Sequence, residues 1–147
     1  WRDVAAYMPA QIIGCLAGAI LANLMFGLPA VSISTTDRFS WPHLLAEVVA
    51  TAGLVLVIFA LARTGRGSVI PWAVGAYIGA AYFFTSSASF ANPAITIGRT
   101  ISDTFAGIAP ASAPGYIAAQ LVGGALGLLL VRGFFGRSAQ AAGHDQQ

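Results

Sequence analysis

The sequence has little charge, no lysine and a single cysteine. Charged side chains make up 8% of its 147 residues, whereas a soluble domain usually carries about 25%. All seven cations are arginines, and too few of them cluster to form a nucleic-acid-binding surface. Because Cys15 is the only cysteine, the chain contains no internal disulfide framework.

Side chains suited to catalysis or metal binding are equally sparse. One cysteine, two histidines and five acids are spread along the chain. They form neither a recognisable nucleophile–base pair nor a metal-binding cluster. We therefore expect no enzymatic activity, no cofactor and no metal site.

Long apolar runs make up most of the chain. Hydrophobic residues account for 57% of it, and the mean hydropathy is +0.77. Four segments approach or reach the roughly 20 residues that cross a bilayer, and they cover residues 5–26, 43–62, 68–85 and 114–135. The sequence therefore predicts an all-α membrane protein that crosses the bilayer several times.

The arginines indicate which way these segments run. If the four spans alternate in direction, Arg38 lies on one side of the membrane, and five arginines lie on the other: Arg2, Arg63, Arg66, Arg132 and Arg137. By the positive-inside rule, the turn at 64–67 and a C-terminal tail at 137–147 are cytoplasmic. Loop 29–42 then lies outside, and segment 86–113 has to start and finish outside.

The tripeptide Asn92-Pro93-Ala94 lies in that last segment. Asn is a favoured helix N-cap, and Pro is favoured in the first helical turn. Such a helix start at membrane depth is tolerated only where protein or a water-filled cavity surrounds it. A half-helix over 92–103 would rise about 15 Å, which is half of a bilayer core. The pattern therefore predicts a re-entrant half-helix beside a pore.

An internal repeat links the two ends of the chain. Five residues recur at identical spacing: Tyr7, Ala10, Gln11, Gly14 and Gly18 match Tyr116, Ala119, Gln120, Gly123 and Gly127. The predicted topology makes the two copies cross the membrane in opposite directions, which is typical of an inverted repeat in transport proteins. The small residues in both copies, Gly14 and Gly18 in one and Gly123 and Gly127 in the other, favour close helix packing.

The repeat also predicts that part of the architecture precedes Trp1. Residues 43–135 contain one whole repeat of span, span, half-helix and span, whereas span 5–26 matches only the last member of the other repeat. We therefore expect two further spans and a half-helix, roughly 70 residues or more, before this chain.

With these features the chain resembles the aquaporins, of the major intrinsic protein family, over nearly its whole length. The resemblance is carried by Asn92-Pro93-Ala94 together with Tyr7-x2-Ala10-Gln11 and Tyr116-x2-Ala119-Gln120. It implies a right-handed bundle of six helices and two half-helices, usually a homotetramer with one pore per subunit. Residues 1–136 would supply the third to sixth helices and the second half-helix.

The resemblance also implies roles for the residues around the tripeptide. Asn92 would donate a hydrogen bond to a passing solute, and Pro93 and Ala94 would build the turn. Most family members have Arg directly after the tripeptide as part of a narrow filter, whereas this chain has Ile95, which lacks both the charge and the donors.

Two further filter positions fall in this chain. Ser89 would fill the filter position on the loop. The position on the fifth helix falls at Ala80, with Gly79 or Ala81 as alternatives. A filter built from Ala80, Ser89 and Ile95 is wider and more apolar than the usual one.

Arg99 is a candidate for the missing charge. It lies four residues after Ile95 and seven after Asn92, so that the three share one helix face. We expect it at the outer vestibule, about 6 Å further out than Ile95. Asp103 follows by four residues and could pair with it. The alternative is a solvated surface pair with no role in the pore.

We expect the other polar residues of the spans to have structural roles. Glu47 is an acid inside an apolar span, and such acids usually have a partner. The resemblance implies that Glu47 accepts hydrogen bonds from backbone N–H groups of the re-entrant loop. Gln11 and Gln120 are interpreted as packing and hydrogen-bonding residues. His43 is interpreted as an interfacial residue, with a pH sensor as the alternative.

The predicted function is passive permeation of small neutral solutes through a membrane channel, with protons and ions excluded near Asn92. The stretch from Phe83 to Ile108 is similar to bacterial aquaporins associated with arsenic detoxification. Arsenite therefore joins water, glycerol, urea and ammonia as a candidate solute, and the bacterial inner membrane is the expected location. The alternatives are a secondary active transporter, whose coupling acid could only be Glu47, and a non-conducting membrane structural protein.

Overall fold

Helices are the only regular elements in the computed structural model, which describes residues 2–136. The predicted tail 137–147, with Arg137, lies outside the described residues. The helices are α1 (Arg2–Met25), α2 (Trp41–Arg63), α3 (Ile70–Phe84), α4 (Pro93–Gly98) and α5 (Ala113–Phe135), with single 3₁₀ turns at Gly67–Val69 and Arg99–Ile101. The prediction of an all-α protein is confirmed.

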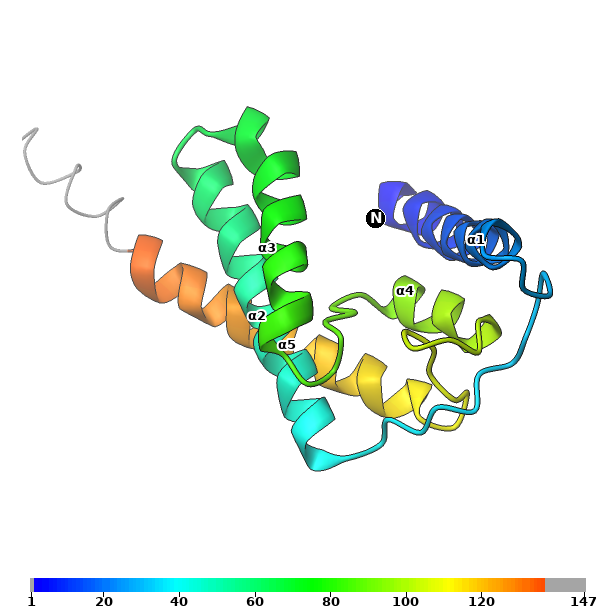
Figure 1. The fold of residues 1–147 in the computed structure, drawn as a ribbon. Coiled ribbons are helices and arrows are strands. Elements are labelled where there is room, and N and C mark those ends of the chain that lie inside the picture. The colour runs from blue at the N-terminus through cyan, green and yellow to red at the C-terminus, as the bar shows by residue number, and fades with distance from the viewer. Residues whose placement is uncertain (1, 137–147) are drawn as a thin grey trace, which may run out of the picture.

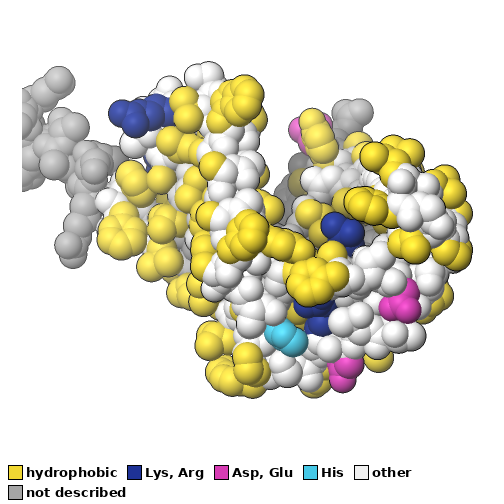
Figure 2. All heavy atoms as spheres, viewed as in Figure 1, with side chains coloured by type: hydrophobic (Ala, Val, Ile, Leu, Met, Phe, Trp, Pro, Cys, Tyr) yellow, Lys and Arg dark blue, Asp and Glu magenta, His cyan; other side chains and the backbone are white. Residues whose placement is uncertain are grey.

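Four of these helices are long and apolar enough to cross a membrane: Asp3–Met25, Trp41–Arg63, Gly67–Phe84 and Ala113–Phe135. Each lies within a few residues of a predicted span. Three of them carry a proline in the first turn, at Pro42, Pro71 and Pro114, where its missing N–H needs no partner. Figure 2 shows hydrophobic side chains spread over the visible outer surface, as a lipid-facing surface requires.

α2 is the centre of one half of the molecule. Figure 1 shows α3 running back along α2 and α5 crossing it. A Cβ on Gly127 of α5 would lie 2.8 Å from the carbonyl oxygen of Ala52 in α2. On the other side of α2, the Tyr77 hydroxyl donates to the carbonyl oxygen of Ala50 at 2.9 Å, and its ring end lies over Gly53. Small residues therefore allow both neighbours to approach α2 closely.

α1 joins the rest of the molecule mainly through α4 and the 3₁₀ turn after it (Figure 1). At the crossing, a Cβ on Gly98 would lie 2.9 Å from Cβ of Cys15. The packing predicted for Gly14 and Gly18 is not found among residues 2–136, since a Cβ on either would meet no atom within 4 Å. The α1 copy of the motif is thus less closely packed than the α5 copy. Its Tyr7 is 67% exposed, whereas the matching Tyr116 is completely buried.

The half-helix is shorter than predicted. Its α-helical part ends at Gly98 and its 3₁₀ turn at Ile101, so it does not extend to residue 103. The chain becomes extended at Ser102, whose hydroxyl donates to Oδ1 of the buried Asn23 at 2.6 Å. This side-chain contact replaces a further helical turn. The nine residues still rise about 15 Å, because the 3₁₀ turn rises more per residue.

A test of the α2–α5 contact uses two adjacent glycines of α5. A methyl group on Gly123 would meet the carbonyl oxygen of Val48 and lie 2.9 Å from Cβ of Thr51, whereas one on Gly124 would meet nothing. We expect Gly123→Ala to destabilise the protein by about 1–3 kcal/mol. Gly124→Ala should be neutral or stabilise it by about 0.5–1 kcal/mol. Thermal unfolding in detergent measures both, and equal shifts in melting temperature would contradict this packing.

Candidate functional site

Asn92 begins α4 and presents a free amide group. Its backbone is extended, with φ −156° and ψ 125°, and its Oδ1 accepts a hydrogen bond from the Ala94 N–H at 2.8 Å. Pro93 takes the first helical position. The Nδ2 group of Asn92 has no hydrogen-bond partner within residues 2–136, and the residue lines a cavity of about 310 Å³ with Gln11. The oxygen thus caps the helix, and the nitrogen can donate elsewhere.

The loop before Asn92 has an unfavourable backbone conformation. Ala88, Ser89 and Ala91 have φ values of 64°, 51° and 50°, in the left-handed region that non-glycine residues rarely adopt. Each such residue costs about 1–2 kcal/mol. The loop therefore requires strong contacts to keep this shape.

Glu47 supplies these contacts from α2. Its Oε1 accepts from the Phe90 N–H and its Oε2 from the Ala91 N–H, both at 2.9 Å, and the side chain is completely buried. The Gln120 Nε2 group of α5 donates to the same Oε2 at 2.7 Å and to the Thr96 hydroxyl at 2.9 Å. These are the contacts expected for Glu47 and Gln120. They bind α2, the loop, α4 and α5 together.

This carboxylate also determines where the loop carbonyls point. In a trans peptide the N–H and C=O groups point in opposite directions. Because the N–H groups of Phe90 and Ala91 face Glu47, the carbonyls of Ser89 and Phe90 face away from it. These two oxygens accept no hydrogen bond from the described residues. The loop thus carries free acceptors next to the free donor of Asn92.

Ile95 and Ser89 lie close to this loop but in different surroundings. Ile95 lines a cavity of about 220 Å³ between α1 and α4, together with Cys15 and Gly18. It also packs against the buried cluster of Phe90, Ile108 and Tyr116. The Ser89 side chain is buried, and its hydroxyl has no hydrogen-bond partner in the part of the chain that the structure describes.

Tyr82 of α3 lies beside Arg99, and the predicted filter position at Ala80 is exposed. Tyr82 lines a larger cavity of about 440 Å³ with Arg99. Residues two apart on a helix point about 200° apart, so Ala80 points to the opposite side. The alternative Ala81 is completely buried, and Gly79 faces open space. The filter role of Ala80 therefore stays a prediction.

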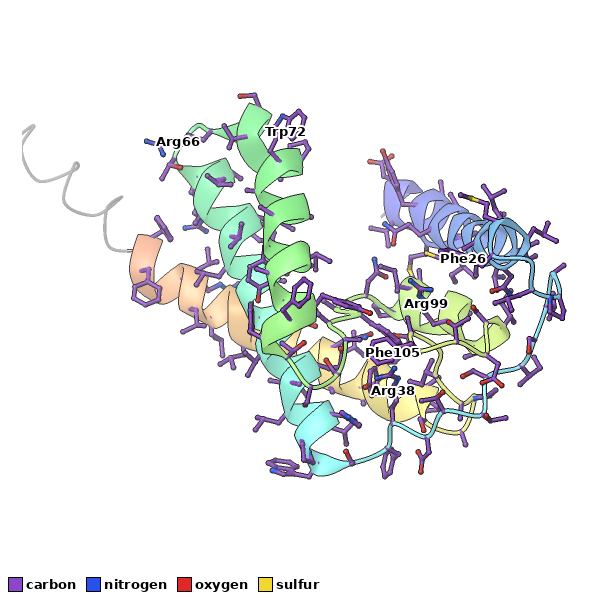
Figure 3. The ribbon with its side chains drawn as sticks, in the orientation of Figure 1. Phe26, Arg38, Arg66, Trp72, Arg99 and Phe105 are labelled. Atoms are coloured by element: carbon purple, nitrogen blue, oxygen red, sulfur yellow. The ribbon has the colours of Figure 1, made fainter. Side chains whose placement is uncertain are left out.

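Arg99 connects the two cavities. It lines both the one beside Ile95 and the larger one beside Tyr82, and Figure 3 shows it between α4 and α1. Its guanidinium forms no ion pair with any residue that the structure describes. The pairing considered for Asp103 is not found, because this carboxylate accepts from the Thr35 N–H at 2.9 Å. The helix that would have brought the two together ends at Ile101.

Comparison with known proteins gives the family of the chain. The model of the major intrinsic protein family matches residues 66–147. The chain belongs to the major intrinsic protein family. It is 48% identical over 131 residues to the aquaglyceroporin AqpS of Rhizobium meliloti (strain 1021), which covers 89% of this chain and 56% of that relative. The chain thus spans little more than half the length of that relative. No solved structure matches it significantly.

In this major intrinsic protein, Arg38 has a role that the sequence did not indicate. Its side chain is 93% buried, since its exposed fraction is 7%. Its Nε donates to the carbonyl oxygen of Gly107 at 2.7 Å and its Nη2 to that of Phe105 at 2.6 Å. The guanidinium also lies 5.7 Å from the centre of the Phe90 ring. From the sequence, Arg38 indicated only the membrane topology. Its hydrogen-bond partners could not be predicted, because they are backbone carbonyl groups almost 70 residues further along the chain.

His43 lies beside this arginine at the start of α2. Its Nδ1 is 3.0 Å from the Ser40 hydroxyl and 3.3 Å from the carbonyl oxygen of Arg38. The residue thus takes part in local hydrogen bonding at the helix start. It lies in the first turn of α2 and not among the residues around Asn92.

The Glu47 contacts can be tested by removing one acceptor. Glu47→Gln keeps the shape but turns an NH₂ group toward a buried N–H group. We expect this to lower stability by about 1–3 kcal/mol. The matched control Asp103→Asn removes a charge at an exposed site and should change stability by less than about 0.5 kcal/mol. If thermal unfolding gives equal effects for the two variants, Glu47 does not hold the loop as described.

Proposed function

We propose that this protein forms a channel through which small neutral solutes cross the membrane passively. The observation that supports it best is that an unpaired donor, the Asn92 amide, follows two unpaired acceptors, the carbonyl oxygens of Ser89 and Phe90. In a bilayer, unpaired backbone groups persist only where protein or a water-filled cavity surrounds them. A solute with hydroxyl groups can accept a hydrogen bond from the Asn92 amide and donate hydrogen bonds to the two carbonyl oxygens.

Glycerol-like solutes and water are the proposed permeants. Ile95 offers neither a charge nor hydrogen-bond donors, which favours polyols over a filter specific for water. The 48% identity to a protein named as an aquaglyceroporin supports the same class. Arsenite is a neutral polyol-like acid and is included in the proposal, as are urea and ammonia. Protons and ions would be excluded near Asn92.

The proposed pore requires a second half. We propose that a first repeat, belonging to the same polypeptide, places its half-helix opposite Asn92 and covers the stripe of Gly14 and Gly18. The open surroundings of both glycines are consistent with this. In the proposal, residues 1–136 form the third to sixth helices of the channel domain, which assembles as a homotetramer.

The proposed orientation follows the arginines. Arg63 and Arg66 lie at the turn between α2 and α3, and Arg132 lies in the last turn of α5. With Asn92 entered from the outside, these arginines are cytoplasmic. We propose a location in the bacterial inner membrane, with tail 137–147 in the cytoplasm.

The engagement of Glu47 favours a channel over a coupled transporter. Coupling would need an acid that can bind and release an ion or proton on the pathway. Both oxygens of Glu47 accept hydrogen bonds from the loop backbone, and the side chain has no exposed surface. A carboxylate whose oxygens both accept hydrogen bonds from the loop backbone stabilises the loop and does not carry an ion or proton.

The width of the filter can be tested at Ile95. In proteoliposomes carrying the complete protein, glycerol flux should rise linearly with its gradient and persist when a proton ionophore is added. Ile95→Arg introduces a long cation and should lower glycerol flux about tenfold with less effect on water. Ile95→Leu, of similar volume, is the control. Saturating flux that requires a proton gradient would instead indicate a transporter.

The charge at Arg99 can be tested separately. We expect Arg99→Ala to increase proton and cation leak about threefold or more, because a positive charge near the path repels cations by roughly 1 kcal/mol or more. Arg66→Ala removes an exposed arginine at the opposite end and should leave the leak unchanged. Unchanged solute flux and leak in Arg99→Ala would remove Arg99 from the pore.

A further inference from the structure

Three arginines lie at the ends of the helices remote from Asn92. Arg63 occupies the last turn of α2, Arg66 lies in the turn that leads to α3, and Arg132 lies in the last turn of α5. All three side chains are exposed. Figure 2 shows dark blue side chains gathered at the end where α2 and α3 meet. We call Arg63, Arg66 and Arg132 the arginine patch.

The packing of α5 on α2 brings Arg132 to the same side of the membrane as the other two. A Cβ on Gly123 would lie 3.0 Å from Cα of Val48, and one on Gly127 would lie 2.8 Å from the carbonyl oxygen of Ala52. The contacts advance together along both helices, so α2 and α5 run in the same direction. Their C-terminal ends therefore reach the same membrane surface.

The elements that carry the arginine patch have no acid to balance it. α2, α3, α5 and the turn between α2 and α3 contain a single acid, Glu47. Glu47 is completely buried and accepts hydrogen bonds from the loop before Asn92. Asp3, at the start of α1, directly follows another arginine, Arg2. The ends of α2 and α5 thus present an unbalanced positive charge.

An exposed tryptophan lies beside this charge. Trp72 is in the first turn of α3 and is 82% exposed. Figure 3 shows Arg66 and Trp72 at the same end of the α2–α3 pair. Tryptophan favours the level of the lipid head groups, because its ring is apolar and its N–H group is polar. The arginine patch therefore lies where the apolar, lipid-facing surface ends and the head groups begin.

We propose that the arginine patch and Trp72 bind the head group of an anionic phospholipid. The guanidinium groups donate hydrogen bonds to the phosphate oxygens, for which arginine offers two parallel N–H groups. The acyl chains lie along the apolar outer surface of α2, where Phe59 is exposed. Phosphatidylcholine also carries a phosphate, but its choline cation opposes the arginines. The inference goes beyond solute permeation, since it requires a location in the membrane and no channel activity.

The experiment measures how lipids stabilise the complete protein in detergent. Thermal unfolding is followed while phosphatidylglycerol, phosphatidylcholine or inorganic phosphate is added. We expect phosphatidylglycerol to raise the melting temperature by about 3 °C or more, because it binds the folded protein, and the other two to have little effect. In the double variant Arg63→Gln, Arg66→Gln, the phosphatidylglycerol concentration that gives half of this shift should rise about tenfold or more, since each arginine near an anionic lipid contributes about fivefold.

Two controls separate charge at this surface from charge elsewhere. Replacing Arg63 and Arg66 by Lys keeps both charges and should preserve most of the shift. Arg99→Gln removes an arginine at the opposite end, and its lipid-induced shift should equal that of the unaltered protein. If the double variant does not fold, the single variant Arg66→Gln decides, with an expected loss of about fivefold.

Three results would overturn the proposal. They are equal shifts from phosphatidylglycerol and phosphatidylcholine, an unchanged half-shift concentration in the arginine variants, and a shift of the same size from inorganic phosphate, which would indicate a site for a free anion. Solute flux does not enter this measurement. A protein that fails to conduct glycerol would therefore contradict the proposed channel and leave the lipid site to be judged by its own result.

Discussion

The carboxylate of Glu47 is the contact on which the candidate site depends. Three left-handed residues before Asn92 would each cost about 1–2 kcal/mol. Hydrogen bonds to a charged group contribute about 1.5–3 kcal/mol each, and Glu47 accepts two of them from the loop and a third from Gln120. The two bonds from the loop are comparable in size to the cost of its strained backbone. The same bonds turn two backbone carbonyls away from α2, so the feature that stabilises the loop also gives it free acceptors.

The internal repeat shows that one motif can have two environments. Gln120 of α5 is buried between Glu47 and Thr96, whereas Gln11, its counterpart in α1, lines the cavity beside Asn92. Gly123 likewise packs closely on α2, while a Cβ on Gly14 would meet no other described atom within 4 Å. The motif therefore specifies a surface suited to close packing. Which element occupies that surface depends on the rest of the assembly.

The sequence predicted the parts of the structure that depend on local chemistry or on a strong resemblance. The four long helices, the cap at Asn92 and the partners of Glu47 belong to this group. It did not predict features that depend on distant contacts. The half-helix ends at Ile101, where Ser102 bonds Asn23, and Arg38 binds the distant carbonyl oxygens of Gly107 and Phe105. No local pattern contains that information.

Two acids, Asp37 and Asp103, lie in the loops before α2 and after α4. The Phe39 N–H and the Ser112 hydroxyl donate to Asp37, and these bonds lower the pKa of its carboxyl group below the usual value. Asp103 is likewise bound to the Thr35 N–H. Both carboxylates are engaged by backbone and hydroxyl donors and pair with no arginine in the described residues. Hydrogen bonds from neutral donors do not cancel the negative charge of a carboxylate, so these two acids balance the charges of Arg38 and Arg99. The proposed exclusion of cations therefore depends on the position of Arg99 beside two cavities and not on a net positive charge.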